Sequence, residues 1–177
     1  LDTQWQWDYP TTIDTYLKRT LDEGFALLDK YPEYLFNFTG SRRYAMMKEY
    51  YPERYERMKK YIAEGRWIVN GSTVDEMDVV NSGPESYLRH FLYGADFARR
   101  EFGVEALDFS LPDCFGFPAT LPTLVAHAGL KGFTTQKLSW QAANPIPFAF
   151  GIWRGPDGSE IYAGLNCMDY TGKVPEN

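Results

Sequence analysis

The sequence has 177 residues, which is enough for one domain with a substantial buried core. Its net charge of −6 disfavours nucleic acid or an anionic membrane as the main partner, because both of these bind basic surfaces. No apolar stretch approaches the roughly 20 residues that a membrane-spanning helix needs. The chain opens on Leu-Asp-Thr and closes on "TGKVPEN", so we expect it to be a piece of a longer protein.

The first half of the chain alternates between helical and strand patterns. Apolar side chains at spacings of three and four indicate an amphipathic helix, and short β-rich runs that lead into glycine indicate strands. Pro52 can open a new helix after the one before it. The predicted elements are a helix over 12–31, a strand over 34–40, a helical region from Ser41, a helix over 52–65, a strand over 66–72 and a helix over 84–102.

The second half continues the alternation and then changes to a strand pair. The predicted elements are a strand over 106–113, a helix over 119–130, a strand over 131–137, and two strands over 148–155 and 160–166 that are joined by a turn at 156–158. Strands that alternate with helices imply βα units and a parallel sheet. No linker or low-complexity stretch divides the chain, so we expect a single unit over residues 1–177.

In folds of this kind the functional groups gather beyond the carboxyl ends of the strands. The residues at those ends are Asp2 (if a strand precedes it), Thr39-Gly40, Asn70-Gly71-Ser72, Asp113-Cys114-Phe115 and Gln136-Lys137. An aspartate in such a place can simply cap the next helix, but Asp113 lies too far before the helix at 119 for that role. We interpret Asp113 as a carboxylate that faces a pocket.

Four blocks of sequence resemble the catalytic domain of family-38 α-mannosidases in both order and spacing. They are "LDTQWQW", "LPDCFGF" with "HAGLKGFTTQK", "FGIWRGPDGSEI" and, especially as in bacterial members, "EYYPERYERMKKYIAEGRW". The resemblance covers nearly the whole chain but only the N-terminal part of such an enzyme. It implies an α/β fold, a parallel β/α barrel of the seven-stranded type of which only the N-terminal βα units are present.

The resemblance also implies an activity and a set of site residues. The enzyme would be a retaining α-mannosidase that removes terminal α-linked mannose from glycans or oligosaccharides, with a zinc ion in its first sugar subsite. Asp113 would be the nucleophile and, with Asp2, a zinc ligand. Trp5 and Phe115 would border the sugar, and Lys137 would stand where an arginine is common. The histidine ligands and the general acid would lie outside these 177 residues, so we expect the chain alone to be inactive.

The implied chemistry explains why these residue types occur together. Cleavage with retention needs a carboxylate nucleophile and a carboxylic acid about 5–5.5 Å apart. Asp113 has to be ionised to attack, and both a zinc ion and the nearby Lys137 would favour its ionised form. An aromatic ring such as that of Trp5 offers a flat apolar face to the C–H groups of a sugar.

Two other functions are weighed against the mannosidase. A metal-dependent polysaccharide deacetylase of related barrel fold needs a His-x-x-x-His pair, and neither His90 nor His127 has such a partner. A non-catalytic carbohydrate-binding module fits the 17% aromatic content but leaves the strand-end acids unexplained. The acids of residues 71–86 are interpreted as a solvated loop rather than as part of the substrate mouth.

The expected partners are a mannose-containing glycan and the remaining domains of a longer parent chain. Nucleic acid is not expected, and neither is a membrane span. Whether the protein forms homo-oligomers stays open, and a cytoplasmic, bacterial-type location is favoured.

Overall fold

The computed structural model describes residues 5–138 and 146–165. Its elements, in chain order, are α1 (Tyr9–Thr11), the π-helical segment η1 (Thr12–Leu17), α2 (Lys18–Lys30), β1 (Phe36–Thr39), α3 (Ser41–Tyr50), α4 (Pro52–Ala63), β2 (Trp67–Asn70), α5 (Pro84–Phe102), β3 (Asp108–Ser110), α6 (Leu121–His127), β4 (Gly132–Thr135), β5 (Phe150–Arg154) and β6 (Glu160–Leu165). The order of helices and strands predicted from the sequence is confirmed.

The ends of these elements follow from local chemistry. The first helical run begins at Tyr9 rather than at residue 12, because the Asp8 carboxylate accepts a hydrogen bond from the Thr11 backbone N at 2.9 Å and caps the run. β3 is shorter at both ends than the strand predicted over 106–113, although the Leu111 backbone N beyond its end still donates to the Thr134 carbonyl oxygen at 2.9 Å. α6 ends before Gly129, which adopts a φ of 81° that few other residues tolerate.

The strands form two sheets. β1 and β2 pair in parallel, with Phe36 opposite Trp67. The second sheet has the order β3-β4-β6-β5, in which β3, β4 and β6 are parallel and β5 is antiparallel to β6. The parallel sheet and the terminal strand pair expected from the sequence are therefore confirmed. A closed seven-stranded barrel is not seen in the part of the chain that the structure describes, which contributes six strands in two sheets.

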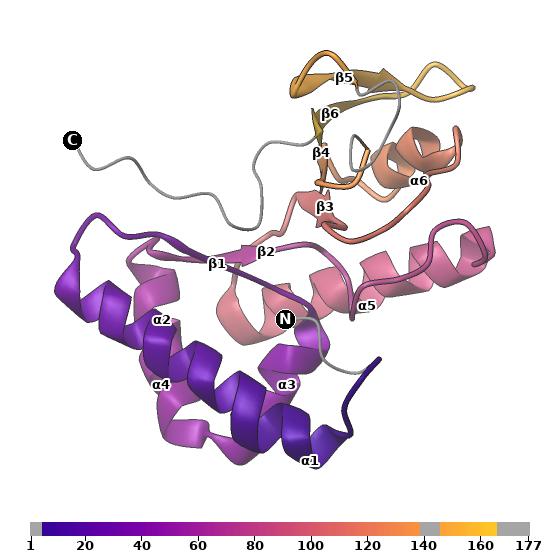
Figure 1. Ribbon diagram of the computed structural model, residues 1–177. Helices are drawn as coiled ribbons and strands as arrows, with labels where there is room; N and C mark the ends of the chain where they lie inside the picture. The colour runs from indigo at the N-terminus through magenta and orange to yellow at the C-terminus, as the bar shows by residue number, and fades with distance from the viewer. Residues whose placement is uncertain (1–4, 139–145, 166–177) are drawn as a thin grey trace.

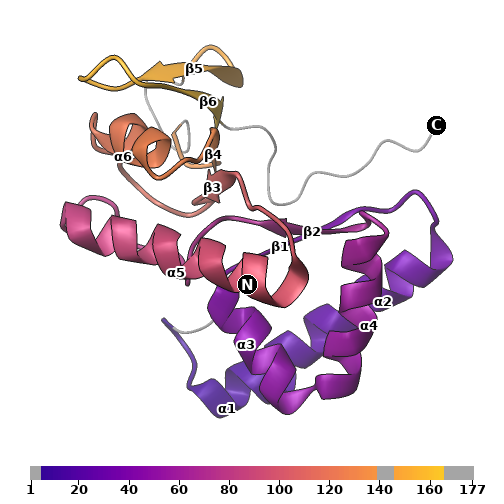
Figure 2. The same ribbon diagram turned by 180° about the vertical axis from the view of Figure 1, so that it is seen from behind.

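Side-chain and backbone bonds join the two sheets where a ladder does not. The Ser72 backbone N, just beyond β2, donates to the carbonyl oxygen of Asp108 at 2.9 Å, and the Ser72 hydroxyl donates to the carbonyl oxygen of Ala106 at 2.6 Å. α5 contacts both α3 and α6, and Figures 1 and 2 show it running alongside the two parts of the molecule. The end of β2 and the start of β3 are thereby held together.

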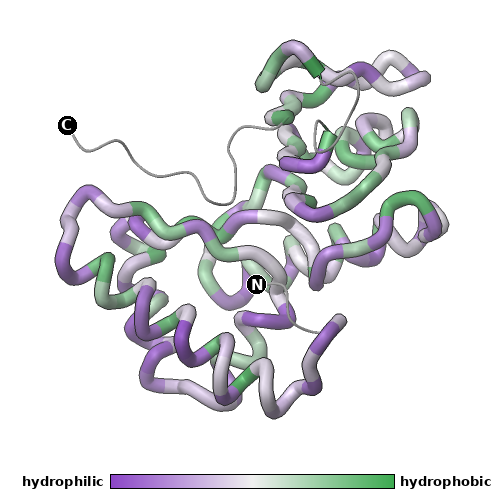
Figure 3. The backbone as a smooth tube through the Cα atoms, in the orientation of Figure 1, coloured by the Kyte–Doolittle hydropathy of each residue, from purple (hydrophilic) through white to green (hydrophobic). Residues whose placement is uncertain are grey.

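The core is divided into two clusters in the same way, and each cluster has large aromatic rings at its centre. One cluster surrounds Trp67 and Tyr44 between β1–β2 and the helices α2 to α4, and the other surrounds Phe109 and Phe133 between the second sheet, α5 and α6. Figure 3 shows hydrophobic and hydrophilic residues alternating along the helices, as amphipathic packing requires. Among the described helices, none has the length and apolar character needed to cross a bilayer.

Candidate active site

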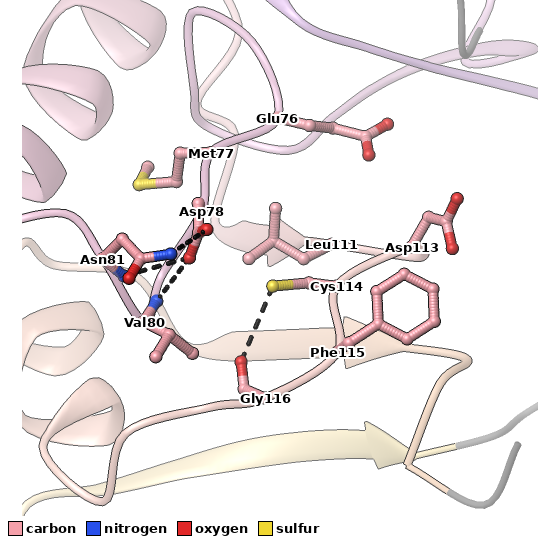
Figure 4. A pocket seen from close by; sticks show the side chains of 10 residues that line it. All are labelled: Glu76, Met77, Asp78, Val80, Asn81, Leu111, Asp113, Cys114, Phe115 and Gly116. Atoms are coloured by element: carbon pink, nitrogen blue, oxygen red, sulfur yellow. Dashed lines mark hydrogen bonds between the residues drawn. The ribbon is translucent and has the colours of Figure 1, made fainter. Parts of the chain in front are cut away.

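A cavity of about 430 Å³ opens between the loop that follows β2 and the loop that follows β3 (Figure 4). This volume lies in the range of roughly 300–1,000 Å³ that is usual for small-molecule sites. Its walls combine acidic, amide and apolar side chains. The lining residues are Glu76, Met77, Asp78, Val80, Asn81, Leu111, Asp113, Cys114, Phe115 and Gly116.

Asp113 and Lys137 form an ion pair at the edge of this cavity. The Lys137 Nζ lies 3.0 Å from the Asp113 Oδ1. The parallel register explains the contact: Ser110 of β3 is paired with Thr134 of β4, and each charged residue lies three positions further along its strand. The Lys137 side chain is 10% exposed and that of Asp113 36%, so the ammonium is largely buried while the carboxylate still reaches the cavity.

Phe115 completes this edge of the cavity. Its ring is exposed, and the Lys137 Nζ lies 5.4 Å from the ring centroid, within cation–π range. The structure therefore brings together three of the residues singled out from the sequence. Trp5 is 70% exposed and is not among the described residues that line the cavity, and Asp2 lies outside the described residues.

The turn that presents Asp113 packs tightly against the opposite loop. Leu111 before it is buried in the core, and the Cys114 thiol donates to the Gly116 carbonyl oxygen with a sulfur–oxygen distance of 3.6 Å. A Cβ at Gly116 would lie only 3.1 Å from the Val80 Cγ2, so a small residue is needed where the two loops meet. The turn is thus shaped by its own chain and by the loop across the cavity.

The acids of the loop after β2 are expected from the sequence to be solvated, and Glu76 and Asp78 are exposed. Both also line the same cavity as Asp113, which the sequence interpretation did not favour. The Asp78 carboxylate accepts from the backbone N of Asn81 at 3.0 Å, from the Asn81 side chain at 2.6 Å and from the backbone N of Val80 at 2.8 Å. These bonds, chiefly those from Asn81, lower the pKa of Asp78. Asp78 therefore holds the loop in shape.

A buried ion pair fixes the start of this loop. The Arg43 Nη1 donates to the Asp75 Oδ1 at 2.9 Å, and Arg43 is only 4% exposed. The backbone N of Ser41 donates to the Thr73 carbonyl oxygen at 3.0 Å, which ties the loop to the start of α3. Gly40 allows this approach, since it adopts a φ of 85° and a Cβ there would lie 2.8 Å from the Arg43 Nη1. This arrangement depends on the long-range pairing of Arg43 with Asp75, and no local sequence motif predicts it.

Two further strand-end residues face inward. Asn70 is the last residue of β2, and Gln136 comes directly after β4. Their side-chain oxygens, Asn70 Oδ1 and Gln136 Oε1, are buried without a hydrogen-bond partner among the described residues. Buried acceptors are normally paired. A substrate hydroxyl, a water molecule or a residue outside the described ranges would satisfy them.

The described residues do not form a metal site by themselves. Among them, no group of three or more histidine, cysteine, aspartate or glutamate side chains could hold a metal ion. His127 is the last residue of α6, and its Nε2 lies 3.0 Å from the Asp157 Oδ2. His90 lies on α5, and its Nδ1 is buried. The Asp113 carboxylate, which lines the cavity and contacts Lys137, is a type of group that zinc accepts as a ligand.

Comparison with known proteins gives consistent matches. A sequence model of the glycosyl hydrolases family 38 N-terminal domain matches residues 1–176. Alpha-mannosidase G of Dictyostelium discoideum is 39% identical over 161 residues, and alpha-mannosidase 2C1 of Homo sapiens is 34% identical over 161 residues; each match covers 91% of this chain. An alpha-mannosidase of Enterococcus faecalis V583 has a similar structure, with a TM-score of 0.75 over 90% of this chain at 21% identity.

These relatives are much longer than the chain. The matches span 15% of the Dictyostelium and human proteins and 18% of the Enterococcus structure. The structural similarity, at 21% identity, supports the fold alone. The family match and the two sequence relatives show the family to which the chain belongs.

Proposed function

Since this chain belongs to glycosyl hydrolase family 38, we propose that it forms part of the catalytic domain of a retaining α-mannosidase acting on terminal α-linked mannose of glycans. The observation that carries this proposal is the position of Asp113, at the carboxyl end of its strand, 3.0 Å from Lys137 and in a cavity bordered by Phe115. The names of the Dictyostelium and human relatives support the choice of α-mannosides. The same membership supports a barrel that the rest of a longer chain would close.

In this proposal Asp113 is the nucleophile. Its carboxylate would attack the anomeric carbon and form a covalent glycosyl–enzyme bond while a carboxylic acid elsewhere in the longer protein protonates the departing oxygen. Water would then attack the same carbon, activated by that second group, and release mannose with retained configuration. Lys137 holds the Oδ1 at 3.0 Å, which leaves the other oxygen for the attack.

The aromatic residues would bind the sugar. The exposed face of Phe115 is at the cavity edge beside Asp113, where it would pack against the C–H groups of a mannose ring. Trp5, which is also exposed, would join it when substrate is bound. Both rings would displace water from the reacting carbon and so strengthen the electrostatic effect of Lys137.

A zinc ion is proposed as the cofactor. Asp113 and Asp2 would hold it, together with histidines outside this sequence, since carboxylate and imidazole are ligands that zinc accepts. When bound it would orient sugar hydroxyls and act as a Lewis acid. Of these ligands only Asp113 lies among the described residues, so the proposal of zinc rests on the family and on the type of donor.

The test is hydrolysis of an aryl α-D-mannoside by the full-length protein. The Asp113→Asn variant is expected to lose about a thousandfold or more in kcat, as removal of a nucleophile does. Asp14→Asn, which changes an exposed aspartate on η1, is the matched control and should keep parental activity. Zinc chelation should also abolish turnover. A folded, zinc-loaded parent without turnover would contradict the proposal and point to another glycoside or to a binding role.

A further inference from the structure

The cavity extends well beyond the proposed nucleophile. Figure 4 shows Asp113 and Phe115 at one side of it and Val80 and Asn81 at the other, with Leu111 between them. The reacting carbon of a mannoside has to lie within reach of the Asp113 carboxylate. The part of the cavity beside Val80 and Asn81 is therefore available to another portion of the substrate.

The stereochemistry of the proposed reaction directs the leaving group toward that part. In a retaining mechanism the nucleophile attacks the anomeric carbon on the face opposite to the bond that breaks. Asp113 lies on the loop after β3, so the leaving group points away from that loop. The loop after β2 forms the facing wall of the cavity, and its lining residues would contact the leaving group.

The backbone of this wall is held in place around Val80. The Val80 backbone N donates to the Asp78 Oδ1 at 2.8 Å, and the Ser82 backbone N donates to the Asp78 carbonyl oxygen at 3.2 Å. Behind the wall, the hydroxyl of the buried Tyr87 on α5 donates to the carbonyl oxygen of Val79. The valine side chain has a single torsion with a strong preference, so its position follows from this fixed backbone.

Val80 gives the wall an apolar surface that reaches the opposite loop. Its side chain is 62% exposed, and a Cβ at Gly116 would lie 3.1 Å from its Cγ2. Next to it, the Asn81 Nδ2 donates to the Asp78 Oδ2 at 2.6 Å, so the Asn81 Oδ1 on the other branch of the amide can accept from a hydroxyl group. An apolar surface with one polar acceptor suits a ring that has an apolar face and hydroxyls at its edge.

We propose that Val80 and Gly116 border a leaving-group subsite for a six-membered ring with an apolar face, such as the second sugar of a glycan, and that Val80 is its specificity-determining residue. The inference rests on the proposed mannosidase function and defines the leaving group that the site prefers. The ring would contact Val80 before its bond to the anomeric carbon breaks. The contact therefore contributes to kcat/KM for any substrate whose leaving group is large enough to reach the valine.

The test compares two substrates that share the mannosyl group and differ in the size of the leaving group. The full-length protein would be assayed with 4-nitrophenyl α-D-mannoside and with α-D-mannosyl fluoride, and kcat/KM would be measured for both. Both substrates give the same glycosyl–enzyme. Their leaving groups differ in intrinsic reactivity, but this difference is the same for every variant. The change in the aryl-to-fluoride ratio between proteins therefore reports contacts with the leaving group.

Val80→Ala removes two methyl groups from the wall. It is expected to lower the aryl-to-fluoride ratio about fourfold, the effect of roughly one buried CH₂ group. Val80→Thr keeps the shape but replaces one methyl group by a hydroxyl, and it should lower the ratio about threefold. Leu92→Ala is the matched control, because Leu92 is 63% exposed on α5 and is not among the described residues that line the cavity. It should leave the ratio unchanged.

Gly116→Ala supplies a second readout through its coupling to Val80. The added Cβ would displace the valine side chain into the subsite, so this variant is expected to lower the ratio about tenfold. In a protein that already carries Val80→Ala there is no Cγ2 to displace, and Gly116→Ala should then change the ratio less than about twofold. Effects of the two substitutions that simply multiply would contradict a shared contact with the leaving group.

Two outcomes separate this inference from the proposed function. A ratio that neither Val80→Ala nor Val80→Thr alters, in a parent that hydrolyses both substrates, would overturn the subsite and leave the mannosidase proposal intact. An equal fall of the ratio in Leu92→Ala would overturn it as well. A folded, zinc-loaded parent that hydrolyses neither substrate would overturn both.

Discussion

The Lys137 Nζ lies 3.0 Å from the Asp113 Oδ1, and the parallel register of β3 and β4 produces this contact. Ser110 and Thr134 are paired in the ladder, so residues three positions beyond each of them leave the sheet side by side. The lysine is largely buried and the aspartate is half-exposed. The pairing of the two strands therefore places a cation against the proposed nucleophile.

Removal of the lysine charge should impair catalysis more than folding. Lys137→Met is expected to lower kcat/KM for an aryl α-mannoside by about ten- to hundredfold, since truncating one partner of a largely buried charge pair costs about 2 kcal/mol or more. Lys137→Arg keeps the positive charge and should stay within about threefold of the parent. The measurement is steady-state kinetics with thermal unfolding as a control for folding. Equal losses in both variants would show that the shape of lysine matters rather than its charge.

A methyl group at Gly94 should destabilise the protein. A Cβ there would lie 2.5–2.6 Å from backbone atoms of Thr73, which are part of the loop that carries Glu76 and cannot move aside as a side chain can. Gly94→Ala is expected to cost about 1–3 kcal/mol or more, as overpacked sites do. Gly83→Ala is the control, because Gly83 has a φ of −78° and nothing within 4 Å of its Cβ position. The measurement is the midpoint of urea-induced unfolding for each variant. Equal midpoints for Gly94→Ala and Gly83→Ala would contradict the close contact between Gly94 and Thr73.

Much of the fold follows from short-range sequence patterns. The helix predicted over 84–102 agrees residue for residue with α5, because Pro84 opens it and Gly103, in the left-handed region, ends it. The proximity of Asp113 and Lys137 was also predictable, since neighbouring parallel strands end at the same edge. These features depend on periodicity, on caps and on the general geometry of βα units.

The position of the loop after β2 could not be predicted in the same way. Its place in the cavity depends on Arg43 and Asp75, which are 32 residues apart, and on the approach of Gly94 to Thr73. No local pattern encodes such contacts, so the sequence predicts a solvated loop but not that Glu76 lines the cavity. The insertion of β6 between β4 and β5 is likewise a tertiary choice, because the turn at 156–158 predicts the β5–β6 pair but not the partner on the far side of β6.

Loss of one buried hydroxyl should weaken the first core cluster. The Tyr44 hydroxyl donates to the Phe38 carbonyl oxygen at 2.9 Å and accepts from the Trp67 Nε1 at 3.0 Å, and both rings are buried. Tyr44→Phe leaves the buried indole N–H without its acceptor and removes one donor to the Phe38 carbonyl oxygen, which is expected to cost about 1–3 kcal/mol in the free energy of unfolding. Tyr50→Phe, at a half-exposed ring, is the control. A Tyr44→Phe protein as stable as the control would show that water or another group replaces the hydroxyl.

The buried carboxyl of Asp108 should make stability depend on pH in an unusual direction. Burial raises the pKa of Asp108, and a hydrogen bond from the Gly71 backbone N at 3.3 Å only partly opposes this. Between the unfolded value of about 3.9 and the higher native pKa, the native state binds more protons than the unfolded state. The contribution of Asp108 to stability is therefore full below about pH 4 and is lost as the pH rises through the native pKa.

Asp108→Asn removes the ionisation but keeps an oxygen that can accept from Gly71. This variant is expected to be more stable than the parent at pH 7, and its advantage should shrink as the pH is lowered toward 4. Urea midpoints at several pH values measure the effect. Asp108→Ala, which removes the acceptor as well as the charge, should gain less than the asparagine variant at pH 7, because the Gly71 N–H loses its partner. An asparagine variant that is less stable than the parent, with a deficit that grows with pH, would mean that the native state stabilises the Asp108 carboxylate.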